Sequence, residues 1–167
     1  MASGTRLFKE LREIQKEKEK MARRGEEEDI ALLPNEQSIY LWRAVVKGPD
    51  GTPFEGGRFK LKITCSEQYP LVPPKVEFVT KVFHPNVHFK TGEICLDILK
   101  TAWSPAWTLQ SVCRAVIALL SHPEADSPLN CDCGNLIRSG DQRGYWSMAR
   151  MYTLEHAVPA SAGLAEA

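Results

Sequence analysis

The chain has 167 residues, of which 43% are hydrophobic and 25% are charged, and its 21 basic side chains are balanced by 21 acidic ones. A chain of this length and composition is typical of one soluble globular domain with its own core. The zero net charge argues against a protein that binds nucleic acid by neutralising many phosphates. No apolar run approaches the roughly 20 residues that span a bilayer, and the N-terminal residues lack the apolar segment of a secretory signal. We therefore expect a cytoplasmic protein that does not insert into a membrane.

The cysteine content predicts free thiols rather than disulfides or a metal centre. Five cysteines are an odd number, and with no secretory signal they suit a reducing compartment. Cys131 and Cys133 are separated by one residue rather than the two of common zinc pairs, and the four histidines show no ligand spacing. We expect no metal site and no cofactor.

The first element is predicted to be a helix over residues 5–24. Leu7, Leu11 and Ile14 recur at helical spacing and give it a narrow apolar stripe. Gly25 follows it as a residue typical of helix ends. The charged stretch from Lys16 to Asp29 is open to two interpretations, a solvated surface or a docking surface.

Four short strands are predicted to follow, over residues 30–33, 40–47, 58–64 and 75–79. In the third, Phe59, Leu61 and Ile63 alternate with basic side chains, which indicates a sheet that is covered on one face. Glycine and proline turns separate the strands. Short connections of this kind permit antiparallel neighbours and predict a meander.

The C-terminal half is predicted to be helical. A core helix capped by Thr108 extends to about residue 121. A short helix is predicted over residues 135–138, and a longer one begins near Asp141. The order is that of an α+β fold with helices on one face and at the ends of the sheet. Residues 1–158 are expected to form the domain and residues 159–167 a flexible tail.

The candidate reactive residue is Cys95, which follows a Thr91–Gly92 turn. Glycine accepts the positive φ of a tight turn, and loops on a rigid scaffold are where binding and catalytic residues concentrate. Considered alone, a cysteine between Ile94 and Leu96 is more often a small buried hydrophobe.

The surrounding motifs change that balance. The segment around Cys95 resembles the active-site signature of ubiquitin-conjugating enzymes. It consists of HPN at 84–86, a short loop with glycine, and ICLDIL at 94–99. The motifs GP, PFEGG, YPLVPPKV, WSPAW and DSPL occur in the order and spacing of that family, so that the resemblance extends from Arg6 to about Tyr152. It implies the ubiquitin-conjugating (UBC) fold, with an N-terminal helix, a four-stranded antiparallel meander, a core helix and two C-terminal helices.

The resemblance also implies a transferase in which Cys95 carries ubiquitin as a thioester. Asn86 is a candidate donor to the oxyanion of each acyl transfer, or it only pins the loop by hydrogen bonds to the backbone, and both roles stay open. Ser127, preceded by Asp126, stands where family members often carry an acidic residue that helps the incoming lysine, and Phe83 stands where many have tyrosine. These departures suit an enzyme that relies on its ligase or that uses a cysteine acceptor.

The same resemblance implies partners. The ligase-facing surface of the family carries over onto Arg6, Lys9, Leu71, Pro105 and Ala106. The implied partners are ubiquitin, the ubiquitin-activating enzyme and a RING-type ubiquitin ligase. ATP is used by the activating enzyme, so none is expected to bind this chain.

A narrower similarity points to the peroxisomal branch of the family. The similarity is found in two segments, VHFKTGEICLDIL and DSPLNCDCGNLIRSGD. In addition, eight residues separate Asn86 from Cys95, where many family members have seven. This branch implies the peroxisomal import receptor as substrate. With no membrane anchor in the chain, it also implies recruitment to the cytosolic face of the peroxisome by a membrane tether, peroxin-22.

Three other functions are alternatives to this one. A general cytosolic conjugating enzyme would share the core motifs but not the peroxisomal similarity. A scaffold that binds ubiquitin without transferring it would lack the nucleophile, which this chain has. A cysteine hydrolase would need a histidine beside the thiol and a group to orient that histidine, and the local signatures of such enzymes are absent.

Overall fold

The computed structural model describes residues 2–159 and residue 162. Within them, the elements occur in the order α1 (Ala2–Arg24), β1 (Ile30–Pro34), β2 (Leu41–Lys47), β3 (Gly57–Thr64), β4 (Lys75–Phe78), the 3₁₀ turn η1 (Asp97–Leu99), α2 (Leu109–Ser121), α3 (Cys131–Arg138), α4 (Gln142–His156) and β5 (Val158–Pro159). No helix in this part of the chain is both long enough and apolar enough to cross a bilayer.

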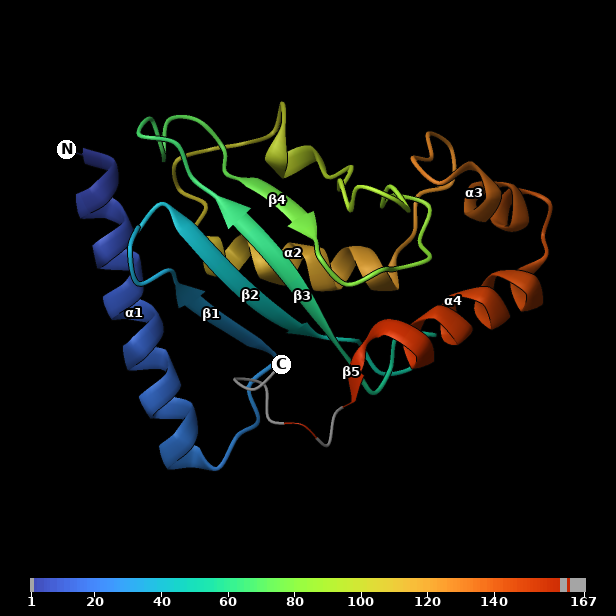
Figure 1. Ribbon diagram of the computed structural model, residues 1–167, viewed down its shortest axis with the longest axis horizontal. Helices are drawn as coiled ribbons and strands as arrows, with labels where there is room; N and C mark the ends of the chain where they lie inside the picture. Colours follow the sequence, from blue (N-terminus) through green and yellow to red (C-terminus); the bar gives the residue numbers. More distant parts are fainter. Residues whose placement is uncertain (1, 160–161, 163–167) are drawn as a thin grey trace.

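The sheet is the predicted antiparallel meander, with strand order β1-β2-β3-β4. Helix α2 lies across one face of the sheet, α1 runs beside β1, and α3 and α4 lie beyond the other end (Figure 1). The predicted α+β architecture is therefore confirmed. Its first helix begins at Ala2 rather than Thr5, and each of the four predicted strands begins and ends within one residue of its predicted bounds.

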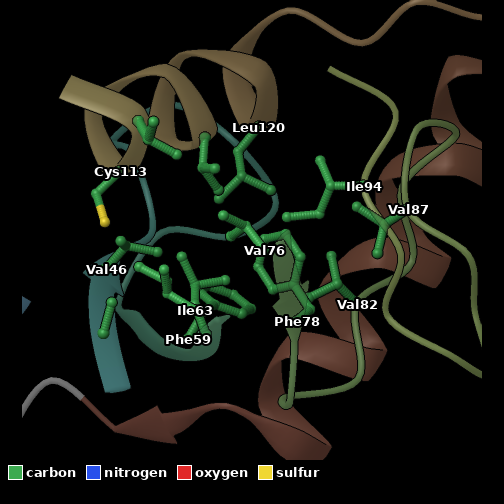
Figure 2. Close-up of a cluster of buried hydrophobic side chains, with 14 of the residues drawn as sticks. Val46, Phe59, Ile63, Val76, Phe78, Val82, Val87, Ile94, Cys113 and Leu120 are labelled. Atoms are coloured by element: carbon green, nitrogen blue, oxygen red, sulfur yellow. The ribbon is translucent and has the colours of Figure 1, made fainter. Parts of the chain in front are cut away.

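The core lies between the sheet and α2. Phe59, Leu61 and Ile63 of β3 are fully buried, as their alternation with basic residues predicted. They join Val76 and Phe78 of β4 and the apolar face of α2 in one cluster (Figure 2). This cluster fixes the scaffold against which the loops described below are held.

Helix α2 begins where the sequence predicts. Thr108 Oγ1 accepts a hydrogen bond from Ser111 N at 3.1 Å, and Ser111 Oγ accepts one from Thr108 N at 2.7 Å. Two backbone N–H groups at the helix start are thus satisfied reciprocally.

Helix α3 begins at Cys131, four residues before the predicted start. Asn130 caps it, since its Oδ1 accepts a hydrogen bond from Cys133 N at 3.1 Å. Gly134 disfavours a helix on propensity alone. In this helix it packs so closely that a Cβ atom would stand 2.7 Å from the ring of Pro128. Tertiary packing therefore outweighs the weak local signal.

The strand β5 was not predicted. Val158 and Pro159 pair antiparallel with Arg58 and Gly57 at the start of β3. Val158 also packs on Val45 and Ala31, which form a small cluster apart from the main core. The expected tail over 159–167 thus begins within a paired strand, and apart from residues 159 and 162 it lies outside the described residues.

Candidate functional site

Cys95 closes a small hairpin whose other end is Asn86. The backbone N–H of Cys95 donates a hydrogen bond to Asn86 O at 2.8 Å, and the next residues inward, Val87 and Ile94, form a β-bridge. Both side chains are buried and point into the core beside Phe78 and Val82 (Figure 2). The hairpin is therefore anchored at its base, and the thiol stands at a fixed place relative to Asn86.

The predicted turn at Gly92 is present and is locked to the sheet. Gly92 has a φ of +76°, and its carbonyl oxygen accepts a hydrogen bond from Phe78 N at 2.8 Å. A Cβ atom at this position would stand 1.9 Å from Phe78 O. Only glycine can combine this φ with so close an approach to β4.

Of the five free thiols, Cys95 is half-buried and Cys131 is exposed, while Cys65, Cys113 and Cys133 are buried. Burial raises the pKa of each of these three thiols to about 12. Since the thiolate is the reactive form, the buried thiols are both inaccessible and protonated. Cys95 and Cys131 are the two thiols that another molecule can reach.

His84 is a structural residue. It is fully buried, its Nδ1 accepts a hydrogen bond from Asn86 N at 3.0 Å, and its Nε2 lies 2.8 Å from Leu119 O in α2. Burial lowers its pKa to about 4. A neutral imidazole with both nitrogens engaged has no free lone pair with which to act as a general base.

The Asn86 side chain is almost fully buried and is bound to the loop after α2. Its Oδ1 accepts a hydrogen bond from Glu124 N, and its Nδ2 donates one to Glu124 O, each at 2.8 Å. This is the geometry of the pinning role. The amide has a second N–H, and among the described residues Glu124 is the one acceptor bound to Nδ2.

The loop that carries Asp126 and Ser127 is fastened to the same segment. Pro85 O accepts hydrogen bonds from Leu129 N at 2.8 Å and from Asn130 N at 3.2 Å. Asp126 and Ser127 themselves are exposed. The structure thus links the two predicted halves of the site, the HPN segment and the residues of the acceptor side, through backbone hydrogen bonds.

The residues after Cys95 form the short turn η1, where no regular element was predicted. Asp97 Oδ1 accepts a hydrogen bond from Ile98 N at 2.8 Å, and Asp97 O accepts two more from Lys100 N and Ala102 N, each at 3.0 Å. Asp97 therefore holds its own turn together by hydrogen bonds from Ile98, Lys100 and Ala102. In the described part of the chain, no cluster of three His, Cys, Asp or Glu residues could hold a metal ion.

The predicted ligase-facing residues come from three segments that meet at one end of the molecule (Figure 1). Arg6 Nη2 of α1 donates to Trp107 O at 2.8 Å, and Trp103 Nε1 donates to Pro70 O at 2.9 Å. Leu71 is 79% exposed, and Lys9, Pro105 and Ala106 are also exposed.

Two residues with central positions were missed by the sequence analysis. Glu124 binds Asn86 through backbone atoms alone, so its side chain gives no signal. Glu10 is buried and lies before the charged stretch from Lys16 to Asp29, to which no site was assigned either. Its position three residues after Leu7 and one before Leu11, on the apolar stripe, was the one available hint.

Comparisons with known proteins show the family and the fold. The family model described as "Ubiquitin-conjugating enzyme" matches residues 6–153. Protein PEROXIN-4 of Arabidopsis thaliana is 63% identical over 158 residues, which cover 95% of this chain and 97% of the relative. Ubiquitin-conjugating enzyme E2 pex4 of Dictyostelium discoideum is 60% identical over 151 residues, covering 90% and 96% of the two chains.

A solved structure of a relative has the same fold over almost the whole chain. It is the H. polymorpha ubiquitin-conjugating enzyme Pex4p in complex with the soluble domain of Pex22p, and it superposes with a TM-score of 0.86 at 38% identity. The match covers 95% of this chain and 100% of the other.

Proposed function

This chain belongs to the ubiquitin-conjugating enzyme family and is a transferase of the Pex4 type, and from that premise we propose that it carries ubiquitin as a thioester on Cys95. The observation that carries the proposal is the anchored hairpin. Cys95 is a partly accessible thiol whose place is fixed by Asn86 O, whereas three of the other thiols are buried.

The reaction consists of two acyl transfers. The Cys95 thiolate attacks the carbonyl carbon of the ubiquitin thioester on the activating enzyme, and the thiolate of that enzyme leaves. An acceptor amine or thiol then attacks the new thioester, gives up its proton, and expels the Cys95 thiolate. Because a thiolate is both a good nucleophile and a good leaving group, the chain has mainly to position the reactants.

We propose that Asn86 serves both steps from its pinned position. The bonds to Glu124 hold the amide beside the hairpin that carries Cys95. Its remaining N–H is the candidate donor to the oxygen on which charge develops, an interaction that typically contributes about 100- to 1,000-fold in rate. Pinning and oxyanion stabilisation are then two uses of one side chain.

On the acceptor side, Ser127 and Asp126 are proposed to contact the incoming nucleophile. Ser127 can form hydrogen bonds but carries no charge with which to attract a lysine ammonium. Transfer to lysine is therefore expected to depend on a RING-type ligase. We propose that the ligase-contact surface is formed by Arg6, Lys9, Leu71, Pro105 and Ala106. The exposure of Leu71 supports this surface.

The peroxisomal assignment rests on the relatives. The Pex4 names of similar chains and the Pex22p complex of a structural relative support a location at the cytosolic face of the peroxisome. We propose that peroxin-22 tethers this chain there and that the import receptor is its substrate. Absence of binding between this chain and the soluble domain of peroxin-22 would contradict the tether and leave the general cytosolic alternative.

The test is a charging assay with ubiquitin, an activating enzyme and ATP, analysed on gels with and without reductant. We expect a thiol-sensitive shift of one ubiquitin that Cys95→Ala abolishes and Cys131→Ala leaves unchanged. Cys131 is the matched control because it is the other accessible thiol. Loading that persists in Cys95→Ala would refute the assignment, and no loading of the wild-type chain would favour a binding scaffold.

A further inference from the structure

Glu10 is a carboxylate buried at the meeting point of three segments. Only 5% of its surface is exposed, whereas Lys9 and Glu13 of the same helix are exposed. A buried carboxylate is costly unless its oxygens are bound by hydrogen-bond donors or a cation. Its partners therefore show what the residue holds together.

Each oxygen of Glu10 binds a donor from a different part of the chain. Oε1 accepts a hydrogen bond from Leu109 N, the first residue of α2, at 2.7 Å. Oε2 accepts one from the Tyr69 hydroxyl at 2.6 Å and one from Arg6 Nε at 3.0 Å. Leu109 is 99 residues and Tyr69 is 59 residues away from Glu10 in the sequence.

The carboxylate thus connects α1 to the loop after β3 and to the start of α2. Two further hydrogen bonds connect the same segments, one from Arg6 Nη2 to Trp107 O and one from Trp103 Nε1 to Pro70 O. The segments joined in this way are the three that carry the proposed ligase-contact residues.

We propose that Glu10 is a positioning residue for ligase-stimulated transfer, an inference that rests on the proposed function. Its charge holds Arg6 against Trp107 and keeps the three segments of the ligase-contact surface in one arrangement. Glu10 acts through Arg6 and the loops, because it is itself buried and its hydrogen bonds go to Arg6, Tyr69 and Leu109.

Glu10→Gln removes the negative charge of the side chain and keeps its size and shape. One amide oxygen can still accept from Leu109 N, and the amide NH₂ can donate to the Tyr69 oxygen, whose hydroxyl can rotate. The NH₂ group then faces Arg6 Nε, and because both groups are donors, no hydrogen bond forms between them. The substitution should therefore release Arg6 and leave the start of α2 and the Tyr69 contact in place.

The experiment measures discharge of the ubiquitin-loaded full chain in two ways. The first is discharge to free cysteine without a ligase. The second is discharge as a function of the concentration of a RING-domain ligase chosen because it stimulates the wild-type chain. Glu13→Gln is the matched control, since Glu13 lies on the same helix and is 64% exposed beside Lys16.

For Glu10→Gln we expect an approximately tenfold higher ligase concentration at half-maximal stimulation, with the ligase-free rate unchanged. Hydrogen exchange of the backbone in 69–74 and 103–108 should also accelerate. Glu13→Gln should match the wild type in all three measurements. A Glu10→Gln response equal to that of Glu13→Gln would overturn the proposal, as would an equal fall in both discharge rates, which indicates a merely structural role.

Tyr69→Phe keeps the test decisive if Glu10→Gln does not fold, because it removes one donor and leaves the carboxylate paired with Arg6. It should raise the half-maximal ligase concentration by a smaller factor with the ligase-free rate unchanged, and no change in either measurement would then overturn the proposal. Failure of the wild-type chain to load ubiquitin at all would instead contradict the proposed function, so the two failures are distinguishable.

Discussion

The side-chain amide of Asn86 and the backbone of Glu124 exchange two hydrogen bonds of 2.8 Å, one in each direction. The contact fixes the loop after α2 against the hairpin that presents Cys95. It leaves the second N–H of the amide outside this contact, and this is the N–H that we propose as the donor to the developing oxyanion. Asn86→Ala removes both the contact with Glu124 and the proposed oxyanion donor. Its effect therefore has to be compared with that of a variant that removes only the contact with Glu124.

We expect Asn86→Ala to slow discharge of the Cys95 thioester about 100- to 1,000-fold, which is the usual cost of losing an oxyanion donor. Glu124→Pro removes the backbone donor to Oδ1 but keeps the N–H groups of Asn86, and it should slow discharge less than about tenfold. Single-turnover assays of the preloaded enzyme measure both. Equal losses in the two variants would assign the effect to pinning alone.

Gly92→Ala should be far more destabilising than Gly51→Ala, although both residues have a positive φ, of 76° and 73°. A Cβ atom at Gly51 meets nothing within 4 Å, whereas at Gly92 it meets Phe78 O at 1.9 Å. We expect a cost of about 1–2 kcal/mol at Gly51 from backbone strain alone and more than about 3 kcal/mol at Gly92. Urea unfolding gives both values, and equal costs would show that the hairpin is free to move away from β4.

Stability should decrease as the pH falls because of His84. Its pKa is lowered from 6.5 to about 4 by burial, so between these values the unfolded chain binds a proton that the folded chain does not. The stabilisation is therefore complete above pH 6.5 and is lost as the pH falls toward 4. Between pH 7 and pH 5 the loss should amount to about 2 kcal/mol.

Urea unfolding at the two pH values tests this, with His84→Gln and the exposed control His122→Gln. Other groups titrate equally in all three proteins, so the difference between variants isolates His84. His84→Gln should have the smaller loss of stability on acidification, and His122→Gln should behave like the wild type. The same pH dependence in all three proteins would contradict a buried neutral imidazole.

Ser127→Asp should accelerate discharge to free lysine at neutral pH and leave discharge to free cysteine unchanged. A carboxylate at this exposed position can attract the ammonium and accept its proton, which Ser127 cannot do, and we expect an acceleration of at least about tenfold. Asp126→Ser, which removes the neighbouring carboxylate, is the control and tests whether that residue already contributes. Equal acceleration with both acceptors would assign the effect to the loop rather than to lysine activation.

The sequence predicted those features that depend on short-range patterns. The alternation of Phe59, Leu61 and Ile63 predicted the face of β3, Thr108 predicted the start of α2, and Gly92 predicted the turn before Cys95, because each signal lies within a few residues. The order of these elements was sufficient for the α+β architecture.

Features that depend on distant partners were not predicted. Helix α3 contains Gly134, which disfavours a helix on propensity alone, and its close packing on Pro128 is not part of any propensity. Strand β5 has two residues and no pattern of its own, and its pairing with Gly57 and Arg58 is visible only in three dimensions. The three partners of Glu10 lie in distant segments or on the charged side of its helix, so its place on the apolar stripe hinted at burial but not at what it binds.

The hairpin between Asn86 and Cys95 is closed at its base and exposed at its tip, so the geometry of its ends does not depend on the length of its tip. The bond from Cys95 N to Asn86 O and the Val87–Ile94 bridge close the base, while Lys90 and Thr91 at the tip are exposed. Because these bonds close the base, we expect a residue added or removed between Lys90 and Thr91 to leave the spacing between the Asn86 amide and the Cys95 thiol unchanged. The length of this loop can then differ between members of the family while the closed base keeps the same geometry.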